Sequence, residues 1–461
     1  MSLARLIGPE LAALVREKDW SVINELIVED IHPEDLADVL GQLDHADAAE
    51  ALTKLPAEYA AQVFERLVEH QQEALTAHMG VASTARIVTE MDVDDLADFV
   101  GALSNETEVA LLEHLEKVDP DVVVEIAELK RWPEHSAGGL MTTEFISVEP
   151  SLTIQQAIAE FRNQAEDIDS NLETIYVVDS RDRVQGYLTM RDLLLSKPNV
   201  LVSDAMHPRI ISVPPELDQE QVAMLFAKYD LNTLPVIQNE EVLGVITSDD
   251  IIDVVTEEQH EDVQKMGAVA PIEGGYLSVP TMMHLKKRAP WLLVLFVGGF
   301  LTTTAMRAYH TVLEAIATLA IYVPLLISAG GNSGAQSSTL VIRGLAVGDL
   351  SLKDWLRVFL RELALGLMLG SLLAVLGVIR VVIAGDGGNM AWLVGCTIIG
   401  IVVLGCVIGG MMPLILHRLG VDPASSSTPF IATLVDVLGI LVYMGLAGWF
   451  LGDLVAAANA S

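Results

Sequence analysis

The run AIATLAIYVPLLISAGGNSGAQSSTLVI, residues 315–342, contains no charged residue and is long enough to cross a membrane as one helix. A spanning helix needs about 20 predominantly apolar residues. Three more uncharged runs lie on either side of it, and a fifth candidate, from Pro429 to Leu451, contains a single charge. The other uncharged runs are Ala289 to Met306, Leu363 to Ile379 and Gly387 to Leu416. The sequence therefore predicts an α-helical membrane domain with five spans.

Lysine and arginine residues near these runs predict the orientation of the chain in the membrane. With the N-terminus in the cytoplasm, eight basic residues flank the cytoplasmic ends of the spans and only two, Arg307 and Arg380, lie outside. The first residues mix charged and apolar side chains without a continuous apolar core, so we expect no signal peptide. We expect a multi-pass protein of the bacterial inner membrane, with the N-terminus in the cytoplasm and the C-terminus outside. The eight cytoplasmic residues are Lys286, Lys287, Arg288, Arg343, Lys353, Arg357, Arg361 and Arg418.

The residues before the membrane half have a very different composition. Through Arg288 there are 55 acidic and 20 basic residues, a net charge of −35, whereas the remainder has 8 acidic and 7 basic residues. So acidic a region is a poor partner for nucleic acid or anionic lipid and a good one for metal cations. Acidity that serves solubility alone is the alternative.

Small residues in the spans offer two sites for close helix packing. Gly366-xxx-Gly370 and Gly405-xxx-Gly409 have the spacing that lets helix backbones approach one another. Both cysteines of the chain lie in the run 387–416, so they supply neither a disulfide framework nor a zinc site.

Asp436 interrupts the last run, in ATLVDVLGILVYM, near the middle of the predicted span. An ionised side chain at that depth costs roughly 3 kcal/mol on insertion scales. No lysine, arginine or histidine lies at matching depth in another span to neutralise it. The carboxyl is then either protonated and silent, or it faces a cavity in which a cation supplies the missing charge. We favour the cation site.

The segment GGNSGAQSS, Gly330 to Ser338, breaks the apolar pattern of the second span after Pro324. Non-helical backbone is tolerated at membrane depth only where it is buried in protein or lines water. We expect loosened backbone here, which offers carbonyl oxygens to a cation beside the side-chain oxygens of Asn332 and Gln336. Mg²⁺ prefers oxygen ligands and gives up its water reluctantly, so a ring of oxygens around a largely hydrated ion would suit it. The alternative is a helix contact through small residues.

An internal repeat occupies residues 141–255. Met141-TTEFISVEPSLTIQQAI resembles Met206-HPRIISVPPELDQEQVA, and the two copies end alike, as GYLTMRDLL and GVITSDDII. The order helix, strand, strand, helix predicts an α/β unit, and the pattern resembles a tandem pair of CBS domains. In that family the Thr-x-x-Asp after the second strand often contacts a nucleotide ribose, which makes ATP a candidate regulatory ligand, although many CBS pairs bind none. The matching residues are Thr189, Asp192, Thr247 and Asp250.

Two helical segments flank this repeat. Residues 1–130 predict an all-helical domain, because DLADVLGQL at Asp35 recurs as DLADFVGAL at Asp95 and short units of this kind stack into a superhelix. Residues 251–269, IIDVVTEEQHEDVQKMGAV, predict an amphipathic helix with apolar Ile252, Val255, Val263 and Met266. Its crowded carboxylates repel one another unless a cation joins them, so we expect this helix to couple metal binding to a gate. They are Asp253, Glu257, Glu258, Glu261 and Asp262.

These parts, in this order, resemble the MgtE family of magnesium transporters. The strings that carry the resemblance are YVPLLISAGGNSGAQSSTLVIRGLAVGDL from Tyr322, LGVDPASSSTPFIATLVDV from Leu419, EHSAGGLMT and EDVQKMGAV. The resemblance covers essentially the whole chain and implies a multidomain protein. Its parts would be an all-α superhelical N domain over 1–135, an α/β tandem CBS pair over 136–255, a connecting (plug) helix and linker over 251–285, and a transmembrane domain over 286–461.

The resemblance also implies a homodimer in the bilayer whose pore lies between the subunits and admits Mg²⁺. Asp436 falls on the position of the principal Mg²⁺ ligand, and the Ala432 carbonyl one turn earlier should assist it. Asn332 matches the family's second-span asparagine, and Glu314 resembles a second pore-associated carboxylate. Some relatives have a more polar residue at Ala335, which leaves open the selectivity over Co²⁺, Ni²⁺ and Mn²⁺.

In the family, cytosolic Mg²⁺ bridges acidic surfaces between domains and holds the pore shut. We therefore expect the acidic half to repel itself at low Mg²⁺, and bound Mg²⁺ to favour the closed state as its concentration rises. Channel and coupled carrier remain alternatives at this stage. The residues that resemble the family's regulatory ligands are Asp94, Asp98, Glu220, Asp230, Asp250, Asp253, Glu258, Glu261, Asp262 and Asp422.

Three other functions fit the sequence less well. A carrier of Co²⁺, Ni²⁺ or Zn²⁺ would call for cysteine or histidine ligands, which are scarce in the spans. A nucleotide sensor that is only anchored in the membrane would need neither Asp436 nor a polar second span. An enzyme is the weakest candidate, because the sequence has no nucleophile–base pair, Gly-rich phosphate loop or metal-hydrolase motif.

Overall fold

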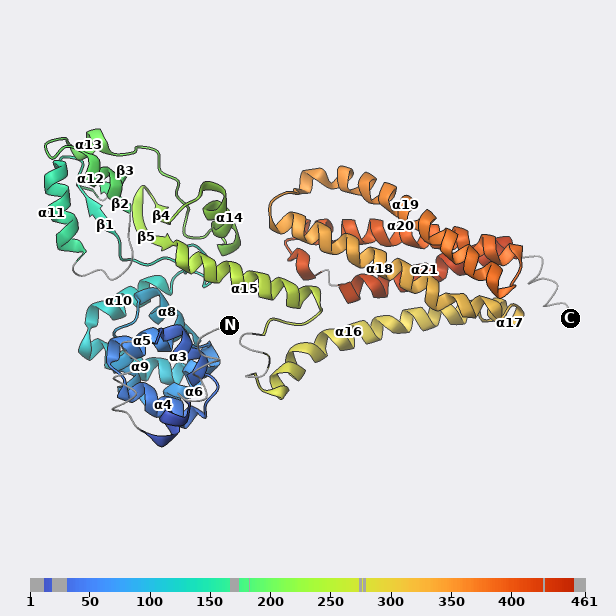
Figure 1. Ribbon diagram of the computed structural model, residues 1–461, viewed down its shortest axis with the longest axis horizontal. Helices are drawn as coiled ribbons and strands as arrows, with labels where there is room; N and C mark the ends of the chain where they lie inside the picture. The colour runs from blue at the N-terminus through green and yellow to red at the C-terminus, as the bar shows by residue number, and fades with distance from the viewer. Residues whose placement is uncertain are drawn as a thin grey trace. The chain divides into compact units, whose positions relative to one another are not determined.

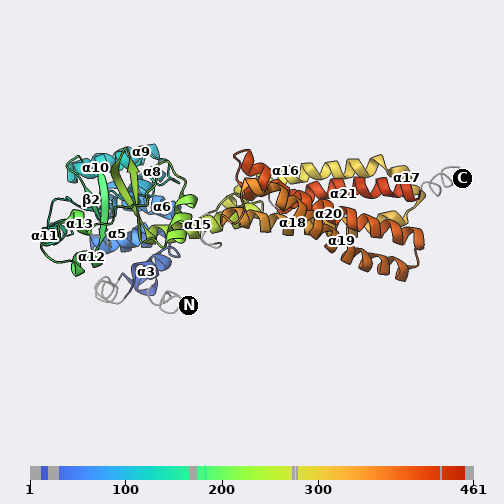
Figure 2. The ribbon, with the colours of Figure 1, turned by 90° about the horizontal axis from the view of Figure 1, so that it is seen from above.

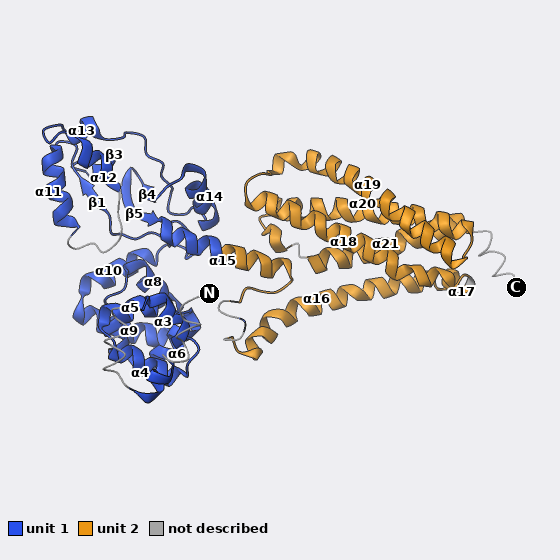
Figure 3. Cartoon of the chain, in the orientation of Figure 1, with its two compact units in different colours: residues 1–256, 274–278 blue, residues 257–273, 279–461 orange. Residues whose placement is uncertain are grey.

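The computed structural model describes residues 12–18, 31–165, 174–181, 183–272, 276, 279–425 and 428–451. The chain divides into two compact units, residues 1–256 with 274–278, and residues 257–273 with 279–461 (Figure 3). The N-terminal residues 1–11, for which we expected no signal peptide, and parts of the predicted linker lie outside the described residues.

The first unit begins with a bundle of short helices, which confirms the all-helical prediction (Figure 1). Each helix turns a face of small and apolar residues inward, and the rings of Phe64 and Phe99 meet edge to face with centroids 5.1 Å apart. Side chains cap several N-termini, as Asp44 does for the helix that begins at His45. The helices are α3 Pro33–Leu40, α4 His45–Lys54, α5 Ala57–Glu65, α6 Glu69–Met79, α7 Val81–Val88, α8 Val93–Ala102, α9 Asn105–Val118 and α10 Pro120–Leu129.

Two small sheets follow, one for each copy of the sequence repeat. Strands β1 Ile146–Val148, β2 Thr174–Val178 and β3 Val184–Thr189 form the first, with β1 parallel to β2 and β2 antiparallel to β3. Strands β4 Thr233–Gln238 and β5 Glu241–Thr247 form the second. Both antiparallel pairs shift register, after Val177 and after Val236, so the repeat extends to local irregularities. The associated helices are α11 Ile154–Gln164, α12 Met190–Leu195, α13 Val202–Ala205 and α14 Gln219–Tyr229.

The predicted connecting helix is α15, Ser248–Met266, and the division between the units falls within it, after Thr256. Its buried apolar residues are Ile251 and Val254. Two members of the apolar face that we predicted, Ile252 and Val263, are 66% and 69% exposed. The amphipathic pattern therefore identified the helix but placed its packed face about one residue away from the observed one.

The second unit contains long helices that lie side by side (Figure 2). Among the described residues, four of them are long and apolar enough to cross a membrane: α16 Thr281–Ala308, α19 Trp355–Ala384 with the short helix η1 Leu352–Asp354 before it, α20 Gly388–Arg418, and α21 Thr428–Phe450. The fifth predicted span corresponds to α18 Thr318–Ala346, which has the length but is not among the four. Short helices α17 His310–Ala315 and η2 Pro423–Ser425 lie in the connections.

The prediction of loosened backbone in GGNSGAQSS is wrong. Helix α18 continues through the whole segment, with Pro324 inside it. The glycines instead allow close packing on α20, because a Cβ atom on Gly334 would lie 3.1 Å from the carbonyl oxygen of Gly405. A Cβ atom on Gly409 would overlap the carbonyl oxygen of Gly334. The alternative that we considered, a contact through small residues, is the one observed.

The predicted glycine pair in α19 packs in the same way. A Cβ atom added to Gly366 would lie 2.8 Å from the Cα of Val403 on α20. A Cβ atom added to Gly370 would lie 2.9 Å from the Cα of Ile399 on the same helix. Helix α20 is thus held at short range by glycines of both α18 and α19. This packing holds α18, which carries the polar segment Gly330 to Ser338.

Candidate cation sites

Asp436 lies on α21 against the polar segment of α18. A Cβ atom on Gly331 would lie 3.6 Å from the Cβ of Ala432 and 3.9 Å from Oδ1 of Asp436. Three predicted pore residues, Asp436, Ala432 and Asn332, therefore come from two facing helices. Within the described residues, no hydrogen bond or ion pair reaches the half-buried Asp436 carboxylate. The sequence prediction of a carboxylate without a basic partner thus agrees with the geometry of the single chain.

A polar stripe runs along α18 beside this carboxylate. Ser328, Asn332 and Gln336 are spaced four residues apart, so they share one helix face, and each is exposed in the single chain. The Asn332 side-chain amide donates to Oγ of Ser328 across 3.3 Å. The amide and hydroxyl oxygens of this stripe can accept hydrogen bonds from the waters of a hydrated Mg²⁺ ion or coordinate the ion directly.

Glu314, the fourth predicted pore residue, is placed differently. It lies on α17, outside the contact between α18 and α21, with an exposed side chain. Its carboxylate pairs with Nδ1 of His310 at 3.4 Å. The structure therefore does not group Glu314 with Asp436.

A second acidic cluster joins the end of α15 to the loop before α21, both within the second unit. Lys265 is its centre, because its ammonium lies 2.6 Å from Oε1 of Glu261 and 2.6 Å from Oδ2 of Asp422. Asp422 is among the predicted regulatory residues, but the sequence analysis did not single out Lys265. The signal was available, since Glu261 and Lys265 have the i, i+4 spacing of helix ion pairs.

The titration of this cluster reflects its crowding. Burial, with the charges of Asp422 and Glu258, raises the pKa of Asp262 to about 6. Partial burial opposes the charged form of Lys265, but its hydrogen bonds to Asp422 and Glu261 raise the pKa of Lys265 to about 12. One fixed cation thus faces several carboxylates, and a divalent ion would relieve the remaining repulsion.

A third cluster lies in the first unit, where α8 and the beginning of α15 bring Asp94 and Asp250 near one another. Oδ1 of Asp94 is buried and has no hydrogen-bond partner among the described residues. Burial, together with the charges of Asp250 and Asp92, raises the pKa of Asp94 to about 7. Asp250 accepts hydrogen bonds from the backbone N–H and hydroxyl of Thr247. Two of the predicted regulatory ligands are therefore close together, and one of them is incompletely satisfied.

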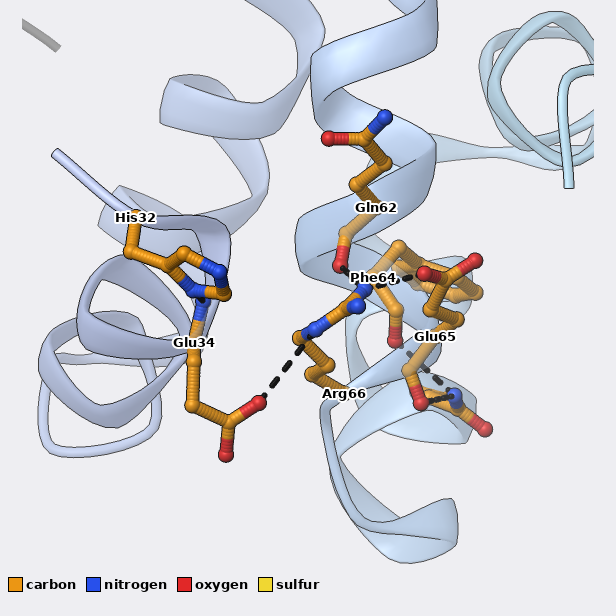
Figure 4. Close-up of polar contacts among 7 residues, drawn as sticks. His32, Glu34, Gln62, Phe64, Glu65 and Arg66 are labelled. Atoms are coloured by element: carbon orange, nitrogen blue, oxygen red, sulfur yellow. Dashed lines mark hydrogen bonds and ion pairs between the residues drawn. The ribbon is translucent and has the colours of Figure 1, made fainter. Parts of the chain in front are cut away.

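Arg66 supplies positive charge in the first unit. From the end of α5 it reaches Glu34 on α3, with Nε 3.3 Å from Oε2, and it also pairs with its neighbour Glu65 (Figure 4). It lies close enough to Asp253 for the two charges to interact. Sequence reasoning did not single out Arg66, because its partners come from three separate elements.

The remaining predicted regulatory residues are not grouped within one chain. Asp98 is exposed on α8, one turn after Asp94. Glu220 lies in the first turn of α14 and Asp230 at its C-terminal end, where Asp230 has a positive φ of 51°. Ten residues of helix rise separate Glu220 from Asp230 by about 15 Å, so one ion cannot bridge them. In the described part of the chain, no group of three or more histidine, cysteine, aspartate or glutamate side chains could hold a metal ion.

The predicted nucleotide contacts are engaged with their own helices. Thr189 and Asp192 form a reciprocal capping box at the start of α12, and Nε2 of His207 lies 3.1 Å from Oδ2 of Asp192. The second copy shows the same contact between Thr247 and Asp250.

Comparison with known proteins identifies the family. Family models match as the divalent cation transporter domain MgtE over residues 323–446, the MgtE intracellular N domain over 31–135, and CBS domains over 137–198 and 202–257. The magnesium transporter MgtE of Thermus thermophilus is 37% identical over 443 residues, which cover 96% of this chain and 98% of the relative. This chain belongs to the MgtE family of magnesium transporters. The predicted family is confirmed, and with it the assignment to transport rather than catalysis.

Other MgtE relatives support the same assignment. The magnesium transporter MgtE of Bacillus subtilis is 30% identical over 93% of this chain and 94% of its own length. A crystal structure of the soluble part of a magnesium transporter is 28% identical with a TM-score of 0.50, and covers 55% of this chain and 99% of that one. The cytosolic domain of the Mg²⁺ channel MgtE in complex with ATP is 33% identical with a TM-score of 0.50, and covers 54% and 99%.

Proposed function

We propose that this MgtE protein is a homodimeric Mg²⁺ channel of the inner membrane that admits Mg²⁺ and is closed by cytosolic Mg²⁺. Each subunit would cross the membrane five times, by α16, α18, α19, α20 and α21. The N-terminus would lie in the cytoplasm and the C-terminus outside, as the basic residues beside the spans indicate. The membrane potential would then drive entry, with roughly 2.3 kcal/mol per charge for each 100 mV.

The observation that carries this proposal is the uncompensated Asp436 carboxylate opposite Gly331 on α18. An ionised carboxylate within a bilayer requires positive charge nearby. The polar stripe of Ser328, Asn332 and Gln336 is unsuited to lipid, and it would line the permeation path with the Ala432 carbonyl. Mg²⁺ keeps several waters and binds through one or two carboxylates, so an ion in contact with Asp436 could pass largely hydrated. Glu314 would act at the outer approach to the path.

Closure would follow from Mg²⁺ binding to the acidic clusters of the cytosolic part. In the first unit, an ion between Asp94 and Asp250 would satisfy the buried Asp94 oxygen and cancel the repulsion between the two. In the second unit, an ion beside Asp262 and Asp422 would hold the end of α15 to the loop before α21. Both ions would bind the closed form more tightly than the open form, and that difference would shift the population. The other proposed regulatory ligands are Asp98, Glu220, Asp230, Asp253, Glu258 and Glu261.

ATP is a candidate regulatory ligand for the CBS pair. The relative whose cytosolic domain was solved with ATP is 33% identical to this chain. Thr189 and Asp192, with Thr247 and Asp250, match the residues that often contact a ribose in such pairs. If Asp192 contacts the ribose of ATP, that contact would replace its present contact with His207.

Mg²⁺ uptake into proteoliposomes tests the proposed pore. Wild type should take up Mg²⁺, whereas Asp436→Ala should reduce the uptake by about tenfold or more, because the path loses the carboxylate that faces the polar segment of α18. Asp349→Ala is a matched control, since it removes an exposed carboxylate from the loop after α18. Equal uptake by Asp436→Ala and wild type would refute the pore assignment.

The proposed closure has its own test in the same assay. A variant that neutralises Asp250, Asp253 and Glu258 should stay active at internal Mg²⁺ concentrations that inhibit the wild type. If it remained inhibited at the wild-type concentration, Mg²⁺ sensing by these residues would be excluded. The control variant neutralises three exposed carboxylates of α9, namely Glu106, Glu113 and Glu116.

A further inference from the structure

Helix α19 carries a buried carboxylate that the proposed permeation path does not use. Glu362 is 6% exposed, and it is the only charged side chain in the buried class among the described residues. Its neighbour Arg361 is exposed, so Glu362 is buried because its side chain lies on the packed face of α19. The run that we predicted as a span began one residue later, at Leu363, which is why sequence analysis passed over it.

Glu362 contacts both neighbouring helices. Its Oε2 accepts a hydrogen bond of 2.6 Å from Oγ of Ser337 on α18, and the Ser337 side chain is also buried. On α20, Gly410 makes room for it, since a Cβ atom there would lie 2.7 Å from Cγ of Glu362. Cys406, one turn before Gly410, is also buried on α20. One side chain therefore links three helices at a single level.

Ser337 belongs to the segment that carries the polar stripe. It directly follows Gln336, so the two side chains project about 100° apart around the axis of α18. Ser333 and Ser337 share the buried face, whereas Asn332 and Gln336 share the exposed one. Whatever fixes the rotation of Ser337 about the helix axis therefore fixes the direction of Asn332 and Gln336.

Other contacts also hold α18. Gly330 packs against the side chains of Ile401 on α20 and Val435 on α21, and Gly334 packs against Ile431 on α21 and the backbone of Gly405 on α20. These are van der Waals contacts and not hydrogen bonds. Apolar surface provides little orienting force in a bilayer, because lipid tails are as apolar as the helices. A hydrogen bond to a buried carboxylate is directional and weakens steeply when its angle changes.

We propose that Glu362 is a positioning residue for ion selection: through Ser337 it holds α18 at the rotation that directs Asn332 and Gln336 toward the path beside Asp436. This inference rests on the proposed pore. Mg²⁺ demands near-ideal octahedral geometry, whereas larger or softer divalent ions tolerate irregular sites. A helix that rotates more freely would therefore discriminate less between Mg²⁺ and Co²⁺.

The test compares Mg²⁺ and Co²⁺ uptake by the full-length protein in proteoliposomes, with the amount of folded protein measured by size-exclusion chromatography. Glu362→Leu and Ser337→Ala each remove the hydrogen bond, whereas Glu362→Gln keeps an acceptor. We expect the first two to lower the Mg²⁺ to Co²⁺ uptake ratio by about threefold or more, which corresponds to the ~0.6 kcal/mol of an average interhelical hydrogen bond. Glu362→Gln should restore the ratio to within about twofold of the wild type.

A matched serine control separates the hydrogen bond from the loss of a hydroxyl group. Ser371→Ala, on α19, removes a hydroxyl that donates to the Leu367 carbonyl of its own helix, and should leave the ratio unchanged. A wild-type ratio in folded Ser337→Ala would overturn the proposal, even if Glu362→Leu failed to fold. So would a Glu362→Gln ratio as low as that of Glu362→Leu. Failure of the pore itself would appear separately, as undiminished uptake by Asp436→Ala.

Discussion

Replacement of Asp94 by asparagine should stabilise the metal-free cytosolic part at neutral pH and remove the share of its pH dependence that comes from this carboxyl. Oδ1 of Asp94 is buried without a hydrogen-bond partner, and burial with the Asp250 and Asp92 charges raises its pKa to about 7. An unfolded aspartate titrates near 3.9, so the unfolded state releases its proton first as the pH rises. Stability is therefore retained below about pH 4 and is lost as the pH rises through the folded pKa of about 7.

The magnitude follows from the same linkage. The folded and unfolded pKa values of Asp94 differ by about three units, which corresponds to on the order of 4 kcal/mol in the free energy of unfolding. About 2 kcal/mol of it is lost between pH 5.5 and pH 8. Urea denaturation of a fragment that ends at Met266 would measure this loss in the presence of a chelator, since the soluble part of a similar magnesium transporter has been crystallised. Wild type should lose this stability over the interval, Asp94→Asn should not, and millimolar Mg²⁺ should restore it in the wild type at pH 8.

Asp38→Asn is a suitable control, because Asp38 is exposed on α3 and its replacement should leave the wild-type pH dependence intact. Equal stability of metal-free wild type at both ends of the pH interval would refute the argument. The same conclusion would follow if Asp94→Asn kept the full wild-type slope.

Two further predictions concern the second unit. Lys265→Gln removes the fixed cation that lies 2.6 Å from Asp422, so Mg²⁺ should bind the cluster more tightly. The Mg²⁺ concentration that half-inhibits uptake should then fall by about fivefold, as expected for the loss of an ion pair worth roughly 1 kcal/mol. A shift to higher Mg²⁺ would mean that Lys265 itself holds the closed state. Gly409→Ala places a methyl group against the Gly334 carbonyl and should destabilise the purified protein by about 1–3 kcal/mol in a thermal-unfolding assay. Gly445 has open space around it, so Gly445→Ala should unfold like the wild type. Equal melting of the two glycine variants would argue against the packing of α18 on α20.

The architecture could be predicted from the sequence because each of its parts has a pattern of apolar and polar residues within one continuous segment. Uncharged runs predicted the membrane helices, the strand-like repeat predicted the two sheets, and apolar spacing predicted the N-terminal bundle. The error at Gly330 to Ser338 has a physical cause. Glycines and serines weaken an isolated helix, but within a bilayer the unpaired backbone would be worse, and the glycines gain contact with α20.

The candidate sites were predictable only in part, because charge clusters form between segments far apart in the chain. Asp436 could be found alone, since an unpartnered carboxylate in an apolar run is itself the signal. Lys265 and Asp422 are separated by more than 150 residues, and only the fold brings them together. Arg66 likewise gains its role from partners on other elements.

The same limit applies to Glu362. It lies at the edge of an uncharged run, where an exposed position at the membrane surface is the ordinary expectation. Its burial depends on Gly410 and Ser337, which come from two other helices. No pattern in the sequence of α19 reveals either contact.

The central claim is that a hydrated divalent ion supplies the positive charge missing at Asp436. Anomalous diffraction from crystals of the full-length protein soaked in Mn²⁺, a hard octahedral stand-in for Mg²⁺, tests it most directly. We predict a peak about 4 to 5 Å from the Asp436 carboxylate, the distance expected for an ion held through one of its own waters. A carboxylate enclosed in dry packing, with no ion and no water path beside it, would contradict the claim.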